Sequence, residues 1–332
     1  MDMSLKKNIA IVAGGYSSEI VISLKSAEGI ESFLDKTRYN TYTVLITKDK
    51  WSVLTDGKEI AVDKNDFSFT ENNIKTRFDF AYITIHGTPG ENGLLQGYLD
   101  MLSIPYSCCG VLAASLTFNK YFCNKYLYAF GVKTAKSVCL RKGEPFDIDA
   151  IEIELGLPVF VKPNDGGSSF GTTKVNQSVD LEDAIQLAFD EGSEVMIESF
   201  IPGTEVTCGC FKTGGELTLL PITEVVSKNE FFDFDAKYNP ASVEEITPAR
   251  ISKHHTEEIQ DLTGKIYNWV GAKGIIRVDY IISGGEIYML EVNTTPGMTA
   301  TSFIPQQIKA AGLDIKEVMS MIIDNELNKI QL

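Results

Sequence analysis

The sequence of 332 residues has no uninterrupted apolar run near the roughly 18 residues that a membrane-spanning helix requires. It is also poor in basic residues, because 30 lysines and arginines stand against 45 aspartates and glutamates, a formal net charge of −15. A surface of this sign repels the phosphates of nucleic acids and anionic membranes, so we expect neither as a partner. The first residues show no signal-peptide pattern, and we expect a cytoplasmic protein.

Cysteine is sparse as well, and its spacing matches neither a zinc CxxC motif nor a redox pair. The six residues form two close pairs and two single positions: Cys108 with Cys109, Cys208 with Cys210, Cys123, and Cys139. Six cysteines in a chain of this length are no disulfide framework. We therefore expect reduced, inert thiols.

What the sequence does contain is an ordinary globular composition, with 44% hydrophobic and 23% charged residues and length for two or three domains. In the first third, apolar β runs at 8–13, 42–46 and 80–85 alternate with helical patterns at 20–34 and 94–102. This βαβ rhythm predicts α/β structure, a small doubly wound parallel sheet.

The middle of the chain changes to shorter strands. A lysine- and tyrosine-rich helix at 119–131 precedes expected strands at 158–162, 172–175 and 195–198, with a helix at 181–191 between the last two. This pattern predicts an α+β module.

The last part of the chain is also expected to be α+β. The expected elements are strands at 205–212 and 217–224, a helix at 252–270, and strands at 275–282 and 286–293 joined by a Gly-Gly hairpin. Between them, the polar and aromatic stretch 228–250 has no regular pattern. A structureless segment of this length inside a compact domain is usually a functional loop, and we expect a lid.

The hairpin carries the most specific chemical signal, because Asp279 lies on its first strand and Glu291 and Asn293 lie on its second. Strand residues two apart share a face, so Glu291 and Asn293 point the same way, as do Arg277 and Asp279. A bulge or twist would bring Asp279 opposite Glu291. Three hard oxygen ligands suit Mg²⁺, and an arginine beside them suits a transferring phosphoryl group. The alternative is a salt-bridged, half-solvated sheet face.

The segment 159–171, VFVKPNDGGSSFG, carries the second signal. An apolar strand ends at Lys162 and opens into a glycine- and serine-rich loop, whose backbone N–H groups can cradle phosphate oxygens beside the lysine charge. The loop is neither a Walker A motif nor GxGxxG. Together with the metal-like face we favour a phosphate-covering flap, and the alternative is a plain glycine-rich turn.

Three further signals are weak on their own. Glu198 and Glu205 flank a Pro-Gly turn, where they can bind an adenosine or remain solvated loop glutamates. Glu19 follows a glycine turn between a strand and a helix, where a helix N-terminus can bind an anion. His86 follows another strand end of the predicted parallel sheet, where ligands bind, although a lone histidine is as often structural.

Taken in order, these blocks resemble the D-alanine–D-alanine ligase family of the ATP-grasp superfamily. The matching blocks are AGGYSSEIVIS, HGTPGENGLLQG, NKYFCNK, VKPNDGGSSFG, IESFIPGTEVT, FDFDAKY, RVDY and LEVNTTPGMTATS, from residue 13 to residue 302. The resemblance implies a three-domain ATP-grasp fold. Its expected parts are an N-terminal domain over 1–116, a central flap domain over 117–203, and a C-terminal domain over 204–332 with the closing loop 228–250.

The resemblance also implies roles for individual residues. ATP would be bound by Lys120, Lys162, Glu198, Glu205 and Lys237, and two Mg²⁺ ions (with Mn²⁺ as a substitute) by Asp279, Glu291 and Asn293. Glu19 would bind the ammonium of the first D-alanine, Ser302 the carboxylate of the second, with His86 on the substrate side, and Arg277 and the N–H of Gly297 would form the oxyanion site. Ser168, Tyr238 and Glu19 would form a hydrogen-bonded set that closes the site.

The implied activity is ATP-dependent joining of two D-alanines through an acyl phosphate, for peptidoglycan precursors, by a homodimer that needs only small-molecule substrates. Three features depart from the family pattern: Asn119 replaces an aspartate, Phe232 and Phe234 replace tyrosines, and Ile20 replaces a histidine or arginine. We expect them to affect loop packing rather than activity. The alternatives are another ATP-grasp carboxylate–amine ligase, a non-catalytic ATP-binding sensor, and a Rossmann oxidoreductase, whose fingerprint is missing.

Overall fold

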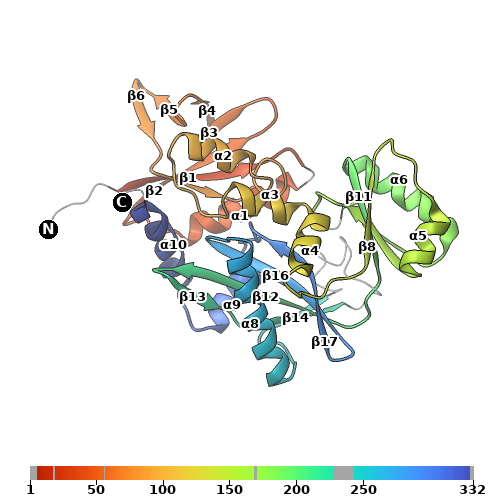
Figure 1. Ribbon diagram of the computed structural model, residues 1–332. Helices are drawn as coiled ribbons and strands as arrows, with labels where there is room; N and C mark the ends of the chain where they lie inside the picture. The colour runs from red at the N-terminus through yellow and green to blue at the C-terminus, as the bar shows by residue number, and fades with distance from the viewer. Residues whose placement is uncertain (1–5, 18, 56, 168–169, 228–242, 330–332) are drawn as a thin grey trace.

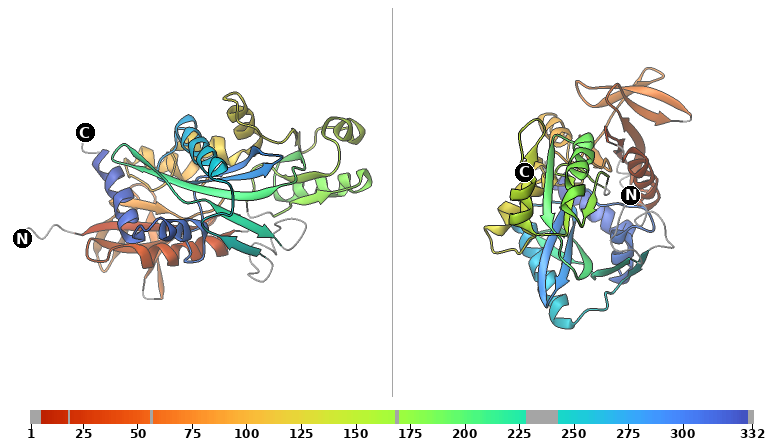
Figure 2. Two further views of the ribbon diagram at one scale, coloured as in Figure 1. Left: turned by 90° about the horizontal axis from the view of Figure 1, so that it is seen from below. Right: turned by 90° about the vertical axis from the view of Figure 1, so that its right-hand side faces the viewer.

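The computed structural model describes residues 6–17, 19–55, 57–167, 170–227 and 243–329. These residues form three sheets. The sheet formed by the middle of the chain, called the central sheet below, lies at one end of an elongated molecule (Figures 1 and 2). The predicted combination of α/β and α+β parts is confirmed. No helix within these ranges is long and apolar enough to cross a membrane.

The N-terminal sheet has seven strands in the order β6-β5-β4-β3-β2-β1-β7. Its elements are β1 (Lys7–Gly14), α1 (Ile20–Phe33), β2 (Tyr39–Ile46), β3 (Trp51–Thr55), β4 (Lys58–Asp63), β5 (Ser68–Glu71), β6 (Ile74–Arg77), β7 (Phe80–Ile83), α2 (Leu94–Met101) and α3 (Val111–Phe118). Only β2, β1 and β7 are parallel, as the βαβ rhythm predicts. The antiparallel strands β3 to β6 are an extension that the sequence analysis did not predict.

Strand β1 shows why this sheet forms. Residues 9–13 are fully buried, with Ile9, Ile11 and Ala13 packed in one core and Ala10 and Val12 in another. A strand that is covered on both faces needs a continuous apolar run rather than alternation, and the sequence supplies one. The carboxyl end of β1 and the adjacent end of β7 therefore open onto the same edge of the sheet.

The central sheet has the order β10-β9-β11-β8 and is antiparallel. Its elements are β8 (Ser137–Arg141), α5 (Ile148–Leu155), β9 (Val159–Pro163), β10 (Thr173–Val175), η1 (Ser178–Asp180), α6 (Leu181–Glu191) and β11 (Glu194–Ser199). One core cluster, from Ile151 to Ile197, belongs to this sheet and its helices alone. The preceding helix α4 (Lys120–Tyr128) buries Cys123 and Leu127 in a different core cluster, shared with strands of the third sheet. The central part is therefore packed as a separate layer, seen at the right of Figure 1.

The third sheet has the order β15-β14-β12-β16-β17, with β13 paired to β12. Its elements are β12 (Thr204–Thr213), β13 (Glu216–Leu219), β14 (Thr223–Ser227), β15 (Val243–Ile246), α8 (Lys253–Trp269), β16 (Ile275–Ser283), β17 (Glu286–Asn293), α9 (Phe303–Ala310) and α10 (Ile315–Lys329). The expected strand 217–224 is two strands, β13 and β14. Within the expected irregular stretch 228–250, residues 243–246 form a strand, and 228–242 lie outside the described residues.

The N-terminal and third parts share a core. Ile11 of β1 and Ile30 of α1 lie in one cluster with Ile304 of α9 and Met319 of α10. At the same contact Gly29 leaves no room for a side chain, because a Cβ there would lie 2.1 Å from the carbonyl oxygen of Met298. Helix α1 is thereby fixed against the loop between β17 and α9.

All six thiols are free, and five are buried with Cys139 half-buried. Burial raises the pKa of Cys108 to about 11 and that of Cys123 to about 12. A thiol of this kind is almost entirely protonated at neutral pH and therefore a poor nucleophile.

Candidate active site

The β16–β17 hairpin pairs Asp279 directly with Glu291, and a bulge lies between Asp279 and Tyr280. This is the register adjustment that the sequence analysis requires, so the predicted register is confirmed. A bulge re-aims the side chains next to it, and here it brings the two carboxylates together. Arg277 pairs with Asn293 two positions further along the same face.

Asp279 is the centre of a hydrogen-bonded cluster. Arg277 donates to both of its oxygens, from Nε at 2.8 Å and from Nη2 at 2.7 Å. Thr207 donates at 2.6 Å from the neighbouring strand β12, and Asn293 donates at 3.0 Å. Burial acts to lower the pKa of Arg277, but the Asp279 charge and its hydrogen bond outweigh it and raise the pKa. The arginine therefore stays charged.

The side chains on this face fit a magnesium ion whose coordination is completed by phosphate oxygens. Asn293 links the two carboxylates, since its Nδ2 lies 3.5 Å from Glu291 Oε1 as well as 3.0 Å from Asp279. Within the described ranges no three His, Cys, Asp or Glu side chains gather as a metal cluster. Two carboxylates and an amide leave coordination positions open for water and phosphate oxygens, which Mg²⁺ prefers to an all-protein cage.

Two of the predicted lysines come from different elements, Lys162 from β9 and Lys120 from α4. Lys162 of β9 forms an ion pair with Glu198 of β11, and both side chains are largely buried. Lys120, at the start of α4, donates to the carbonyl of Gly166 in the flap loop and lies 3.5 Å from Glu291. Lys120 therefore contacts both the flap and the acidic face.

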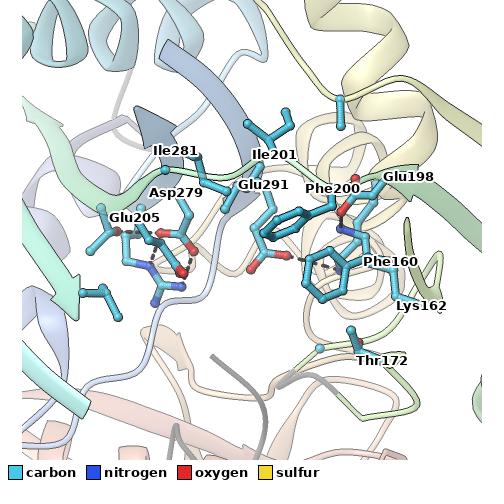
Figure 3. Close-up of a pocket in the computed structure, with 18 of the residues that line it drawn as sticks. Phe160, Lys162, Thr172, Glu198, Phe200, Ile201, Glu205, Asp279, Ile281 and Glu291 are labelled. Atoms are coloured by element: carbon cyan, nitrogen blue, oxygen red, sulfur yellow. Dashed lines mark hydrogen bonds and ion pairs between the residues drawn. The ribbon is translucent and has the colours of Figure 1, made fainter. Parts of the chain in front are cut away.

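A cavity of about 440 Å³ joins these groups between the central and third sheets (Figure 3). It is lined by seven of the predicted residues: Lys120, Lys162, Glu198, Glu205, Arg277, Asp279 and Glu291. Figure 3 shows Phe160 and Phe200 beside the Lys162–Glu198 pair, Asp279 and Glu205 on the other side, and Glu291 between. The Phe160 and Phe200 rings lie 5.8 Å apart. The end with the two rings thus combines aromatic walls with a buried ion pair, and the other end carries the acidic face with Arg277; the first suits a nucleotide's base and the second its phosphates.

Glu19 and His86 lie at a second group of contacts, at the edge of the N-terminal sheet. Glu19 is buried directly before helix α1, and Ser17 donates to the carbonyl of His86 at 3.2 Å. The flap comes close here, because a Cβ on Gly167 would lie 2.6 Å from Glu19 Oε2. The His86 ring lies 3.4 Å from the hydroxyl of Ser26. The predicted substrate-side residues therefore adjoin the predicted flap.

The loop that carries Gly297 and Ser302 joins this second group. The N–H of Met298 donates to the buried Ser26 hydroxyl at 3.4 Å, so one hydroxyl lies between that loop and His86. Ser302 precedes α9 and accepts from the N–H of Thr299 at 3.0 Å. A Cβ on Gly297 would lie 3.0 Å from Ser302 Oγ, which places the two predicted residues side by side.

Several predicted residues lie outside the described ranges. They are Ser168, Lys237 and Tyr238, together with the departures Phe232 and Phe234. Their assigned roles remain predictions.

Sequence reasoning missed Glu91, a half-buried glutamate in the loop after β7. Its carboxylate accepts from the N–H of Gly87 at 2.7 Å. Burial raises the pKa of Glu91 to about 8, and the nearby Glu19 charge acts in the same direction. The motif HGTPGENG contained the signal, because an acid five residues after His86 returns to the same strand end when the intervening residues form a turn.

Asn164 and Glu194 were missed as well. Asn164 is fully buried and donates to Glu194 at 2.8 Å. Nothing in their spacing marks them, because the contact depends on the pairing of β9 with β11.

Comparison with known proteins covers nearly all of the chain. Residues 8–109 match the family model described as D-ala D-ala ligase N-terminus, and residues 127–324 match D-ala D-ala ligase C-terminus. A D-alanine–D-alanine ligase of Azobacteroides pseudotrichonymphae is 66% identical over 96% of this chain and 99% of its own length. The crystal structure of D-alanyl-alanine synthetase A from Vibrio cholerae is 28% identical with a TM-score of 0.88, over 98% of this chain and 99% of that one. VanG D-Ala:D-Ser ligase from Enterococcus faecalis is 30% identical with a TM-score of 0.82, over 99% and 100%.

Proposed function

The chain belongs to the D-alanine–D-alanine ligase family, and from this premise we propose how its residues divide the work. The protein is an ATP-dependent ligase that joins two D-alanines into D-alanyl-D-alanine for peptidoglycan precursor synthesis. The observation that carries this function is the 66% identity to a relative of that name along 96% of the chain. The contacts within the site support the assignments that follow.

The cavity binds ATP with the base at its aromatic end. Phe160 and Phe200 flank the base, and Glu205 binds the ribose. Lys162 and Lys120 contact the phosphates and Glu198 lies on the adenine side, so Lys162 leaves Glu198 for a phosphate when a polyanion enters. Because both lysines contact carboxylates in this structure, the nucleotide replaces partners that already hold them in place.

Asp279, Glu291 and Asn293 would hold the metal, two Mg²⁺ ions in the family pattern. When bound, Mg²⁺ supplies positive charge that offsets the charge on the phosphate oxygens. Arg277 uses two of its five N–H groups on Asp279, so three remain for the substrate. The guanidinium and the N–H of Gly297 therefore stabilise the oxyanion of the tetrahedral intermediate.

The amino-acid side binds both D-alanines. Glu19 binds the ammonium of the first, whose carboxylate attacks the γ-phosphate and becomes an acyl phosphate while ADP leaves. Ser302 holds the carboxylate of the second, whose amine then attacks the acyl carbon and expels phosphate. The acyl phosphate hydrolyses if water reaches it, so the flap and the loop containing Lys237 and Tyr238 cover it.

The remaining assignments complete the proposal. The chain comprises domains 1–116, 117–203 and 204–332, acts in the cytoplasm and forms a homodimer. The separate core of the central sheet supports its treatment as a domain.

A coupled assay of ADP release tests the function. D-Alanine with ATP and Mg²⁺ should give ADP and a dipeptide of the mass of D-alanyl-D-alanine. L-Alanine alone should give neither, and D-serine or D-lactate should compete poorly as second substrate. ADP release with D-serine as the better acceptor would contradict the substrate assignment and place the enzyme beside the D-Ala:D-Ser ligases.

A further inference from the structure

The first turn of helix α4 is completed by two asparagines from different parts of the chain. The N–H groups of its first three residues, Lys120, Tyr121 and Phe122, have no partner within the helix. Asn164 accepts the first with its carbonyl at 3.1 Å and the second with its side chain at 2.8 Å. Asn119 accepts the third with its side chain at 2.9 Å. The N–H groups of this turn therefore all donate to groups of the protein, so it is the Lys120 side chain, and not the helix N-terminus, that would bind a phosphate.

Glu194 joins the two asparagines. Its Oε2 accepts from Nδ2 of Asn164 at 2.8 Å and from Nδ2 of Asn119 at 3.1 Å. The Glu194 carbonyl also accepts the N–H of Asn164 at 2.9 Å. Burial acts to raise the pKa of Glu194, but hydrogen bonds from Asn164, Arg141 and Asn119 outweigh it and lower the pKa. The carboxylate is therefore an ionised acceptor with two donors on one oxygen.

Asn119, where the family resemblance implies an aspartate, suits this arrangement. Its Oδ1 caps the helix, as an aspartate would, while its Nδ2 supplies the donor to Glu194 that an aspartate lacks. An aspartate at 119 would instead place a second carboxylate beside the same oxygen.

Asn164 also lies two residues after Lys162 on the chain, directly beyond strand β9. It is fully buried, and it holds the backbone of Lys120 through two hydrogen bonds. We propose that Asn164, fixed by Glu194 and Asn119, is a positioning residue that sets Lys120 in place relative to Lys162. This inference rests on the proposed function, which assigns both lysines to the ATP phosphates.

The test is Asn164→Asp, which keeps the size and shape of the side chain but removes the donor to Glu194 and sets two carboxylates together. We expect the Kd for ADP and the KM for ATP to rise about tenfold, as the loss of one buried hydrogen-bond partner implies, with the KM for D-alanine unchanged within about twofold. Glu194→Ala, at a half-buried position, should shift both in the same direction by less. The matched control is Arg141→Gln, which removes an exposed donor to the other oxygen of Glu194 and should leave both constants unchanged.

A double-mutant cycle separates this inference from the function on which it rests. Lys120→Met alone should weaken ADP binding, and adding Asn164→Asp should weaken it little further, because Asn164 acts through Lys120. Full additivity of the two effects would overturn the positioning role. A lower unfolding temperature with unchanged ADP affinity in Asn164→Asp would overturn it too, leaving a purely structural residue. Unchanged ADP affinity in Lys120→Met would instead refute the phosphate assignment of Lys120.

Discussion

The nucleotide end and the amino-acid end of the site are built from different kinds of contact. At the nucleotide end, cations pair with carboxylates: Lys162 of β9 pairs with Glu198 of β11, and Arg277 pairs with Asp279 two residues along the same strand, β16. At the amino-acid end, backbone groups, hydroxyls and glycines touch closely, as Gly29 does with the Met298 carbonyl. Ion pairs therefore position the side chains of the nucleotide end, and close packing positions those of the amino-acid end.

This difference indicates which contacts within the protein must change when a ligand binds. A charged pair can exchange one partner for a phosphate without moving the backbone, so the nucleotide end can accept its ligand through side-chain rotation. A backbone contact with no spare room has no such freedom, because interiors are packed as densely as crystals. Substitutions at the first end should therefore change nucleotide affinity and rate, and those at the second should change stability and D-alanine binding.

The largest expected effect is that of Glu291→Gln. The change removes a carboxylate that both the metal and Lys120 would use, and we expect kcat to fall about a thousandfold, or roughly 4 kcal/mol of transition-state stabilisation. Steady-state ADP release at saturating Mg²⁺ measures it. The control is Glu286→Gln, at an exposed position on the same strand, which should leave kcat unchanged. More than about a tenth of wild-type activity in Glu291→Gln would break the metal assignment.

The next effect is that of Lys162→Met, which tests whether the pairs serve the nucleotide. Loss of a charge-assisted contact should raise the KM for ATP tenfold to about a hundredfold and leave the KM for D-alanine unchanged. The change also leaves the buried Glu198 carboxylate without its cation, so the free energy of unfolding should fall. Adding Glu198→Gln should recover the unfolding temperature but not the KM. Recovery of both would show that the pair is only structural.

At the packed end, Gly29→Ala should act in the opposite way. The added methyl would lie 2.1 Å from the Met298 carbonyl, and overpacking costs about 1–3 kcal/mol of stability. We expect a lower unfolding temperature and a KM for D-alanine raised about fivefold, with the KM for ATP unchanged. Gly97→Ala is the matched control in helix α2, where a Cβ meets only Val111 at 3.7 Å. A raised KM for ATP in Gly29→Ala would erase the contrast between the two ends.

The smallest effect concerns pH, because Glu91 brings a titrating group to the packed end. Burial raises the pKa of Glu91 from 4.5 to about 8, so the stability that its protonated form adds is fully present below about 4.5 and is lost as the pH rises from there to about 8. Glu91→Gln keeps the neutral state at every pH. Between pH 5 and pH 9 the unfolding temperature of the wild type should therefore fall relative to that of the variant. Parallel melting curves across this range would refute the raised pKa.

The charged end could be predicted from the sequence, whereas most of the packed end and its supports could not. Alternation along a strand fixes which residues share a face, so the hairpin alone indicated Asp279, Glu291 and Asn293 together. The contacts of Gly29 and Asn164 depend on how one sheet lies against another, and no local pattern records that.

The antiparallel extension of the first sheet is an intermediate case. Its turns contain Gly57, Asn72 and Asn73 at positive φ, residue types that mark tight hairpins, so a signal was present and was not used. Its strands of four to six residues lack the long apolar runs that indicated β1. Helices α9 and α10 were likewise not predicted, although they complete the core beneath α1.

The burial of the thiols has a practical consequence for spectroscopy. A maleimide reacts with thiolate, and five of the six cysteines are enclosed, with the pKa of Cys139 raised to about 11 mainly by burial. Cysteines introduced at exposed Asn176 on the central part and at exposed Lys58 on the first would thus be labelled selectively without replacing any native cysteine. A fluorophore at each would report the distance between flap and first sheet in solution, during turnover, in an otherwise unaltered enzyme.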